Sequence, residues 1–169
     1  MRTTLAHLAT RLATGALAGL ALAACNHVSA DTESRALRDP ACPLAINEVA
    51  AAGEPTDWFE LVNVSRAPLD LSAFVFTDAE TSLAHAAHLP PTVLAPGARH
   101  VQEVTAADAG FRLGGEDALY LYRADDGHRC DGVCWHDDDA PRGGSLARLP
   151  DGTGGFETAM PDTRGVRNR

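Results

Sequence analysis

Short segments of alternating apolar and polar residues fill most of the chain, and glycine, proline and aspartate interrupt them at close intervals. The segment Asp57–Val64 shows the alternation most clearly, because Trp58 and Glu60 would project to one side of a strand and their neighbours to the other. No helix-length window keeps an apolar face without a glycine or proline break. The chain is therefore expected to be all-β, and short strands at this spacing favour a sandwich or barrel.

Two turn sequences connect the expected strands. Ala95-Pro96-Gly97-Ala98 predicts a type II turn, because proline fixes the second position and glycine accepts a positive φ at the third. Asp125-Asp126-Gly127 predicts a hairpin with a two-residue turn, because Asp-Gly suits its left-handed angles. The other expected strands are Leu44–Ala51, Leu69–Asp78, Thr92–Leu94, Arg99–Val104, Ala118–Arg123, Arg129–Trp135 and Ser145–Leu149.

The core depends on few large residues, because aromatic residues make up 5% of the chain and much of its apolar content is alanine. The globular part, residues 44–169, has the size of one immunoglobulin-like antiparallel β-sandwich. The expected core residues are Trp58, Phe59, Leu61, Phe74, Phe76, Leu119, Tyr120, Leu121 and Trp135.

The charge of the chain argues against a nucleic-acid partner. All 14 basic residues are arginine, and the formal net charge is −9. Removal of the leader described below would take Arg2 and Arg11 with it and make the charge more negative still. A surface this acidic repels phosphate backbones and anionic lipid headgroups.

The first 24 residues are typical of an export signal. Met1–Arg11 is positively charged, and Leu12–Ala24 is an unbroken run of small and apolar residues. A bilayer core requires roughly 20 residues, so this run is too short to span it and fits the apolar region of a secretory signal peptide. The protein is therefore expected to be exported.

The end of the leader, Leu22-Ala23-Ala24-Cys25, resembles the bacterial lipobox. The resemblance implies that Cys25 becomes lipidated, begins the mature protein and anchors it to the membrane of the cell envelope. Asn26 follows the cysteine where aspartate would favour retention at the inner membrane, which favours the outer membrane if two membranes exist. Residues 25–43 are polar and contain Pro40 and Pro43, so we expect a flexible tether.

A series of short motifs runs in a specific order from Leu44 to Asn168. The motif residues are Asn47 and Glu48; Asp57, Trp58, Glu60 and Asn63; Asp70, Leu71 and Ser72; Pro96 and Gly97; and Asp151 and Gly152. Their joint order resembles the lamin-tail domain, an immunoglobulin-like β-sandwich that also occurs in bacterial envelope proteins. The chain departs from the family at Ala73-Phe74, where Gly-Trp is usual. The resemblance implies a non-enzymatic scaffold or binding module.

The acids Glu48, Asp57 and Glu60 lie in adjoining expected strands. They could form a carboxylate pair for hydrolysis or metal binding, but catalytic carboxylates need a shared cleft that nothing in the sequence indicates. The structural interpretation is favoured, in which these acids accept backbone N–H groups or face solvent. The family resemblance explains the same acids as markers of the fold.

Metal ligands are present only as weak candidates. Asp137, Asp138 and Asp139 form an acidic run that could bind calcium weakly, but they lack the alternating spacing of a calcium loop. The histidines, His85, His88, His100 and His136, have no evident third ligand, and zinc normally has three or four. No metal site and no cofactor are therefore expected.

Three cysteines remain after Cys25, and export would permit a disulfide. In a regular strand Cys130 and Cys134 would lie about 13 Å apart, beyond the limit of about 7 Å for a bridge. Cys42 would then pair with one of them and tie the end of the tether to that strand. If Asp131-Gly132 is instead a tight turn, Cys130 would pair with Cys134, and the remaining alternative is that no disulfide forms.

The favoured function is a lipid-anchored binding or scaffold module whose loops or sheet edge contact an envelope or extracellular protein or polymer. The long segment Ala79–Pro91 is the candidate contact surface. One alternative is a metal-dependent extracellular hydrolase that uses Glu48, Asp57, Glu60 or the run Asp137–Asp139. The other is a purely architectural envelope protein.

Overall fold

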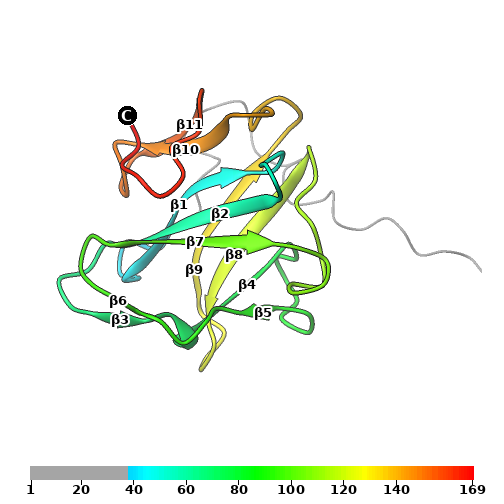
Figure 1. Cartoon of the computed structure of the whole chain (residues 1–169). Helices are drawn as coiled ribbons and strands as arrows, with labels where there is room; N and C mark the ends of the chain where they lie inside the picture. The colour runs from blue at the N-terminus through cyan, green and yellow to red at the C-terminus, as the bar shows by residue number, and fades with distance from the viewer. Residues whose placement is uncertain (1–37) are drawn as a thin grey trace, which may run out of the picture.

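In the computed structural model, residues 38–169 are described and form an all-β sandwich of antiparallel sheets (Figure 1). The expected signal peptide, Cys25 and most of the tether lie outside the described residues. The five-stranded sheet has the order β11-β10-β1-β2-β7. Its strands are β11 (Gly155–Ala159), β10 (Ser145–Leu149), β1 (Leu44–Ala50), β2 (Asp57–Asn63) and β7 (Arg99–Val104).

The facing sheet has four strands in the order β5-β4-β8-β9. These are β5 (Ala87–His88), β4 (Phe74–Thr77), β8 (Asp117–Arg123) and β9 (Arg129–Trp135). A small sheet pairs β3 (Leu69–Asp70) with β6 (Val93–Leu94). None of the described residues forms a helix long and apolar enough to cross a membrane.

All nine residues expected in the core are buried. The main cluster fills the space between the sheets, where the ring of Phe59 meets that of Phe76 edge-on at 4.9 Å. Tyr120 belongs to a second, smaller cluster that also contains Val75 and Tyr122. The four-stranded sheet therefore carries buried apolar residues on both of its faces.

The expected strand Leu69–Asp78 is wrong, because the chain breaks into β3, a 3₁₀ turn over Leu71–Ala73, and β4. The Asp70 side chain caps this turn by accepting the backbone N–H of Ser72 (3.0 Å), and the turn buries Leu71 in the core. Short polar side chains at such caps compete with an extended backbone. The strand β11 was not predicted, because Phe156 is its one buried residue and leaves no alternation to recognise.

The Pro96-Gly97 turn has the predicted form: Ala98 N donates to Ala95 O (3.0 Å), and Gly97 has φ 73°. The hairpin between β8 and β9 is also present, but its two-residue turn is wrong. Arg123 N donates to His128 O (2.9 Å), so the connection runs from 124 to 127 and only Gly127 within it has positive φ.

Candidate functional site

A β-bulge at Asn47 brings several of the motif residues together. The pairing of β1 with β2 shifts between Ile46 and Glu48, so Asn47 is the extra residue. A bulge redirects a side chain and frees backbone groups. Asn47 Nδ2 donates to Glu60 Oε1 (2.8 Å) and to Asp151 Oδ1 (3.1 Å), while Asn47 Oδ1 accepts Gly152 N (2.8 Å).

Two buried glutamates on this face hold the C-terminal segment, residues 163–169. Glu48 Oε1 accepts Thr163 N (2.7 Å), and Glu60 Oε2 accepts Gly165 N (2.9 Å). Asn168 Nδ2 donates to Asn47 O (3.0 Å). These acids therefore serve as hydrogen-bond acceptors within the fold, which is the role that the structural interpretation gave them.

Burial raises the pKa of Glu60 to about 7, although the hydrogen bonds from Asn47 and Gly165 and the charge of Arg99 lower it. The nearby charge of Glu48 raises it further. Arg99 Nε lies 3.3 Å from Glu60 Oε1, and the Arg99 guanidinium also pairs with Asp151. Glu60 is therefore a titratable group inside the network that fixes the C-terminal segment.

Three further motif residues make other contacts. The half-buried Asp57 carboxyl accepts a backbone N–H from Leu113, and burial raises its pKa. Trp58 is buried beneath the guanidinium of Arg164, whose central carbon lies 5.4 Å from the ring centroid. Asn63 Nδ2 donates to Leu94 O (2.8 Å). The three acids Glu48, Asp57 and Glu60 line neither of the two hollows described below.

A buried ion pair that the sequence did not predict joins the two sheets. Arg148 Nη2 donates to both carboxylate oxygens of Asp131 (2.9 and 3.0 Å), and Arg148 Nε donates to Ile46 O (2.6 Å). Asp131 Oδ2 accepts Ile46 N (2.8 Å). The pair therefore satisfies backbone groups of β1 next to the bulge.

Burial raises the pKa of Asp131 and lowers the pKa of Arg148, while the charge of each partner opposes the shift of the other. The Arg148 guanidinium also lies over the Phe156 ring, 4.3 Å from its centroid. One signal in the sequence could have found this pair: Asp131 is an acid in a strand whose other residues from 130 to 135 are apolar or glycine. It was instead considered as half of a tight turn with Gly132, whereas both residues lie in β9.

A disulfide joins Cys42 to Cys130, which confirms the predicted pairing of Cys42 with a cysteine of this strand. A second bulge makes it reachable: the pairing of β8 with β9 skips Cys130 and turns it into the main core. Cys134 is free and half-buried. Asp39 N also donates to Cys130 O (2.8 Å). The flexible tether predicted to reach residue 43 is thus wrong at its end, because residues 39–43 are fixed to the sandwich.

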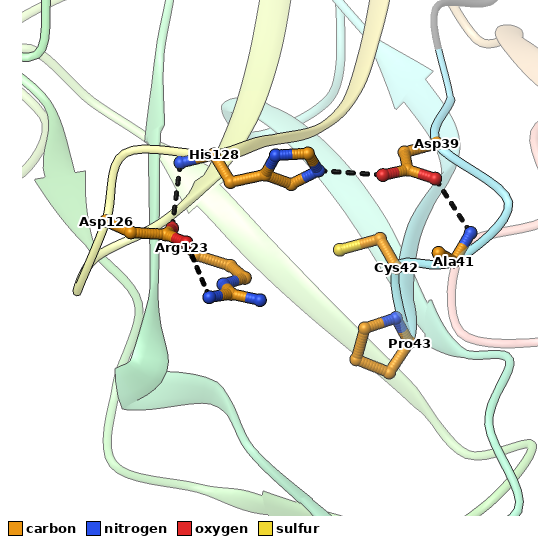
Figure 2. Close-up of a pocket in the computed structure, with 7 residues that line it drawn as sticks. All are labelled: Asp39, Ala41, Cys42, Pro43, Arg123, Asp126 and His128. Carbon is orange, nitrogen blue, oxygen red and sulfur yellow. Dashed lines mark hydrogen bonds and ion pairs between the residues drawn. The ribbon is translucent and has the colours of Figure 1, made fainter.

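The tip of the β8–β9 hairpin carries two open hollows, and Arg123 lines both of them. The first, of about 200 Å³, is lined by residues that include Asp39, Cys42, Arg123, Asp126 and His128 (Figure 2). His128 Nε2 lies 2.7 Å from Asp39 Oδ2, and Arg123 Nη2 donates to Asp126 Oδ2 (2.6 Å). The His128–Asp39 contact therefore joins the hairpin to the segment before β1, whereas Arg123 and Asp126 pair within the hairpin.

The second hollow, of about 370 Å³, is lined by Leu69, Ala73, Phe74 and the hairpin residues 123–125. The segment Ala79–Pro91 reaches the same tip, since Leu83 Cδ1 lies 3.4 Å from the position that a Cβ on Gly127 would occupy. Arg129 Nη1 pairs with Glu80 Oε1 (2.6 Å) and fixes the base of this segment. Residues 81–85 are exposed. We call this combined area, residues 81–85 with 123–128, the hairpin-tip surface.

The weak metal candidates do not converge. Asp137 and Asp138 are exposed, and Asp139 accepts His136 N (2.9 Å). Residues 38–169 contain no group of three or more His, Cys, Asp or Glu side chains placed to hold a metal ion. His85 and His88 lie in a loop and in β5, so the helical turn that would bring them together is absent from this part of the chain.

No protein-family model matches the chain, and no curated protein matches it. The lamin-tail resemblance therefore stays a prediction carried by the motif residues of the sequence.

Proposed function

We propose that the protein is an exported, lipid-anchored envelope lipoprotein whose lamin-tail-like sandwich is a non-enzymatic binding or scaffold module. The hairpin-tip surface would contact the partner, an envelope or extracellular protein or polymer. The observation that carries this proposal is the disulfide Cys42–Cys130, because disulfides form and persist in oxidising compartments outside the cytoplasm. It agrees with the export signal and with Cys25 at its end.

The use of the buried acids supports a binding role over the hydrolase alternative. Glu48 and Glu60 each accept the backbone N–H of a residue in the C-terminal segment, and Asp131 is paired with Arg148. A carboxylate that performs chemistry needs access to substrate, whereas these have side chains with no exposed area. These acids line neither of the two open hollows at the hairpin tip.

The hairpin tip has the character of a contact surface. Loops at the end of a sandwich commonly bind partners because a rigid scaffold positions them. Here the disulfide at Cys42 fixes the floor of one hollow, and Leu83 exposes 40% of its surface beside the tip. A rigid base and an exposed apolar side chain together favour recognition of another molecule.

The anchor is tested by metabolic labelling of cells with an alkyne-bearing fatty acid, followed by membrane fractionation. The full chain is expected to incorporate the label and to sediment with membranes. Cys25→Ser should abolish both, whereas Cys134→Ser, which removes the free cysteine of the sandwich, should leave both unchanged. Equal labelling of the wild-type protein and of Cys25→Ser would contradict the proposed anchor. So would a wild-type protein that incorporates no label.

A further inference from the structure

The strand β7 forms one edge of the five-stranded sheet and has a single neighbour in it, β2. It pairs with β2 from Arg99 opposite Val62 to Val104 opposite Asp57, without a register shift. Figure 1 shows β7 beside β2 at the margin of this sheet. An unbulged edge of this length is a template on which another strand can pair.

The alternation of the ladder fixes which backbone groups of β7 face outward. Asn63 N donates to Ala98 O (3.1 Å), and Asn63 O accepts Gly97 N (2.8 Å). Paired groups recur at every second residue of an antiparallel ladder, so His100 and Gln102 also turn their N–H and C=O toward β2.

The N–H and C=O groups of Arg99, Val101 and Glu103 therefore face away from the sheet. Within residues 38–169, no strand pairs with these groups. The Arg99 side chain is held by Glu60, and the Glu103 side chain pairs with Arg164 (2.6 Å), so both charges are fixed on one face of the sheet. The Glu103 C=O accepts Nε2 of the adjacent Gln102 side chain (2.8 Å), a bond that a pairing strand would have to displace, and the outward groups of Arg99 and Val101 are left clear.

The other sheet edges are less suited to pairing. On β9, Cys130 O accepts Asp39 N, and Gly132 N donates to the Asp131 carboxylate (2.8 Å). The edge strand β5 has two residues. The edge strand β11 has Glu157 at its centre, and a two-fold axis there would place this charge opposite itself.

We propose that two copies of the chain associate edge to edge through β7, as an antiparallel pair with a two-fold axis at Val101. A two-fold interface must be self-complementary, and the sequence of β7 meets this condition. Arg99 lies opposite Glu103 of the second copy, and Val101 lies opposite its own counterpart. The three outward-facing residues of each copy then form about six backbone hydrogen bonds across the axis.

Charge selects this register over its neighbours. An axis at Arg99 would place two arginines directly opposite each other, and an axis at Glu103 would do the same with two glutamates. Like charges in directly opposite positions destabilise a strand pair. Axes at His100 or Gln102 avoid this conflict but place Val101 opposite Arg99 or Glu103, so the axis at Val101 is the register that forms both opposite-charge pairs. This inference does not depend on the lipid anchor or on the hairpin-tip surface.

The register is tested by disulfide trapping of the full-length protein in intact cells, with Cys134→Ser as the background. Directly paired residues have Cα atoms about 5.5 Å apart, within disulfide reach, so Val101→Cys should form a covalent dimer. The control is Glu103→Cys, which is more exposed but would lie about 14 Å from its counterpart. Peptide mapping identifies the linked positions.

The expected result is a dimer linked at residue 101, at about ten times the yield of Glu103→Cys. Equal yields of the two variants, no dimer from Val101→Cys, or linkage of residue 101 to a different protein would each overturn the proposal. Circular dichroism of both variants checks that the sandwich is intact.

A second measurement uses the unmodified chain and does not depend on either variant folding. Amide hydrogen exchange is followed at Val101 and at Gln102 in dilute and in concentrated protein. The Val101 amide faces the edge, so its exchange should slow several-fold as association increases, whereas the Gln102 amide already bonds to β2 and should not change. Exchange at Val101 that is independent of protein concentration would overturn the proposal.

Discussion

Glu60→Gln tests the electrostatic description of the network around the C-terminal segment. Burial raises the pKa of Glu60 from 4.5 to about 7, so the folded protein retains a proton that the unfolded chain releases between these values. Stability falls with rising pH wherever the folded state binds more protons. The wild type should therefore lose stability as pH rises through this range, while glutamine, which does not titrate, should not lose it at this site.

The size of the effect follows from the shift. A pKa difference between 4.5 and about 7 corresponds to about 3 kcal/mol of free energy of unfolding. The stability of Glu60→Gln relative to wild type should thus improve by about 3 kcal/mol between pH 4 and pH 8. Other groups that titrate in this range, such as Asp57, contribute equally to both proteins and cancel in the difference.

Urea denaturation at pH 4, 6 and 8 measures this difference, with Trp58 and Trp135 as fluorescent probes of unfolding. The exposed Glu157→Gln, on β11, is the matched control and should show the same pH dependence as wild type. A relative stability of Glu60→Gln that changes by less than about 1 kcal/mol over this range would refute the assignment of a buried, proton-retaining Glu60.

Three further predictions concern the free energy of unfolding. Reduction of the Cys42–Cys130 disulfide should lower it by about 4 kcal/mol, because the bridge closes a loop of 88 residues; equal denaturation curves with and without reductant would argue against this. Asp131→Ala should cost about 3 to 5 kcal/mol in urea titration, because it leaves the Arg148 guanidinium buried without a counter-charge; a loss under about 1 kcal/mol would show that water reaches the site. Gly97→Ala should cost about 1 kcal/mol in the same assay, because φ is 73° and a Cβ there meets no neighbouring atom; an unchanged midpoint would contradict the turn geometry.

The elements that sequence reasoning could locate are those that local pattern specifies. The alternation of Asp57–Val64 located β2, and the Pro96-Gly97 turn has its expected hydrogen bond and positive φ. The ends of β9, Arg129–Trp135, also agree with the prediction. The turn is specified by contacts between residues a few positions apart. The two strands are specified by residues that are buried on at least one face of the sheet.

The polar network could not be predicted because it depends on two bulges. One extra residue at Asn47 aims the amide at Glu60 and Asp151, and one at Cys130 turns the sulfur toward Cys42. Nothing in the local sequence states which residue of a strand will be unpaired. The sequence alone therefore cannot decide whether Cys130 or Cys134 is the disulfide partner of Cys42.

The motif residues acquire a physical explanation from the fold. Asn47, Glu48 and Glu60 lie in two neighbouring strands, yet their hydrogen bonds reach Asp151 and the C-terminal segment more than a hundred residues further along the chain. Such long-range bonds carry no signal in a local pattern. Sequence reasoning could therefore mark these residues as structural without predicting what they hold.

Cross-linked capture of partners from intact cells, using the anchored chain with a C-terminal tag, tests the binding module most directly. The variant for comparison replaces only the exposed residues 81–85, which leaves buried Leu89 and the strand β5 in place. A control variant replaces five exposed residues, 106–108, 110 and 112, in the loop that follows β7. The account predicts reproducible capture of one envelope protein or polymer other than the chain itself, lost in the first variant and kept in the control. No specific capture, with the protein spread evenly through the membrane fraction, would contradict the binding role and favour an architectural one.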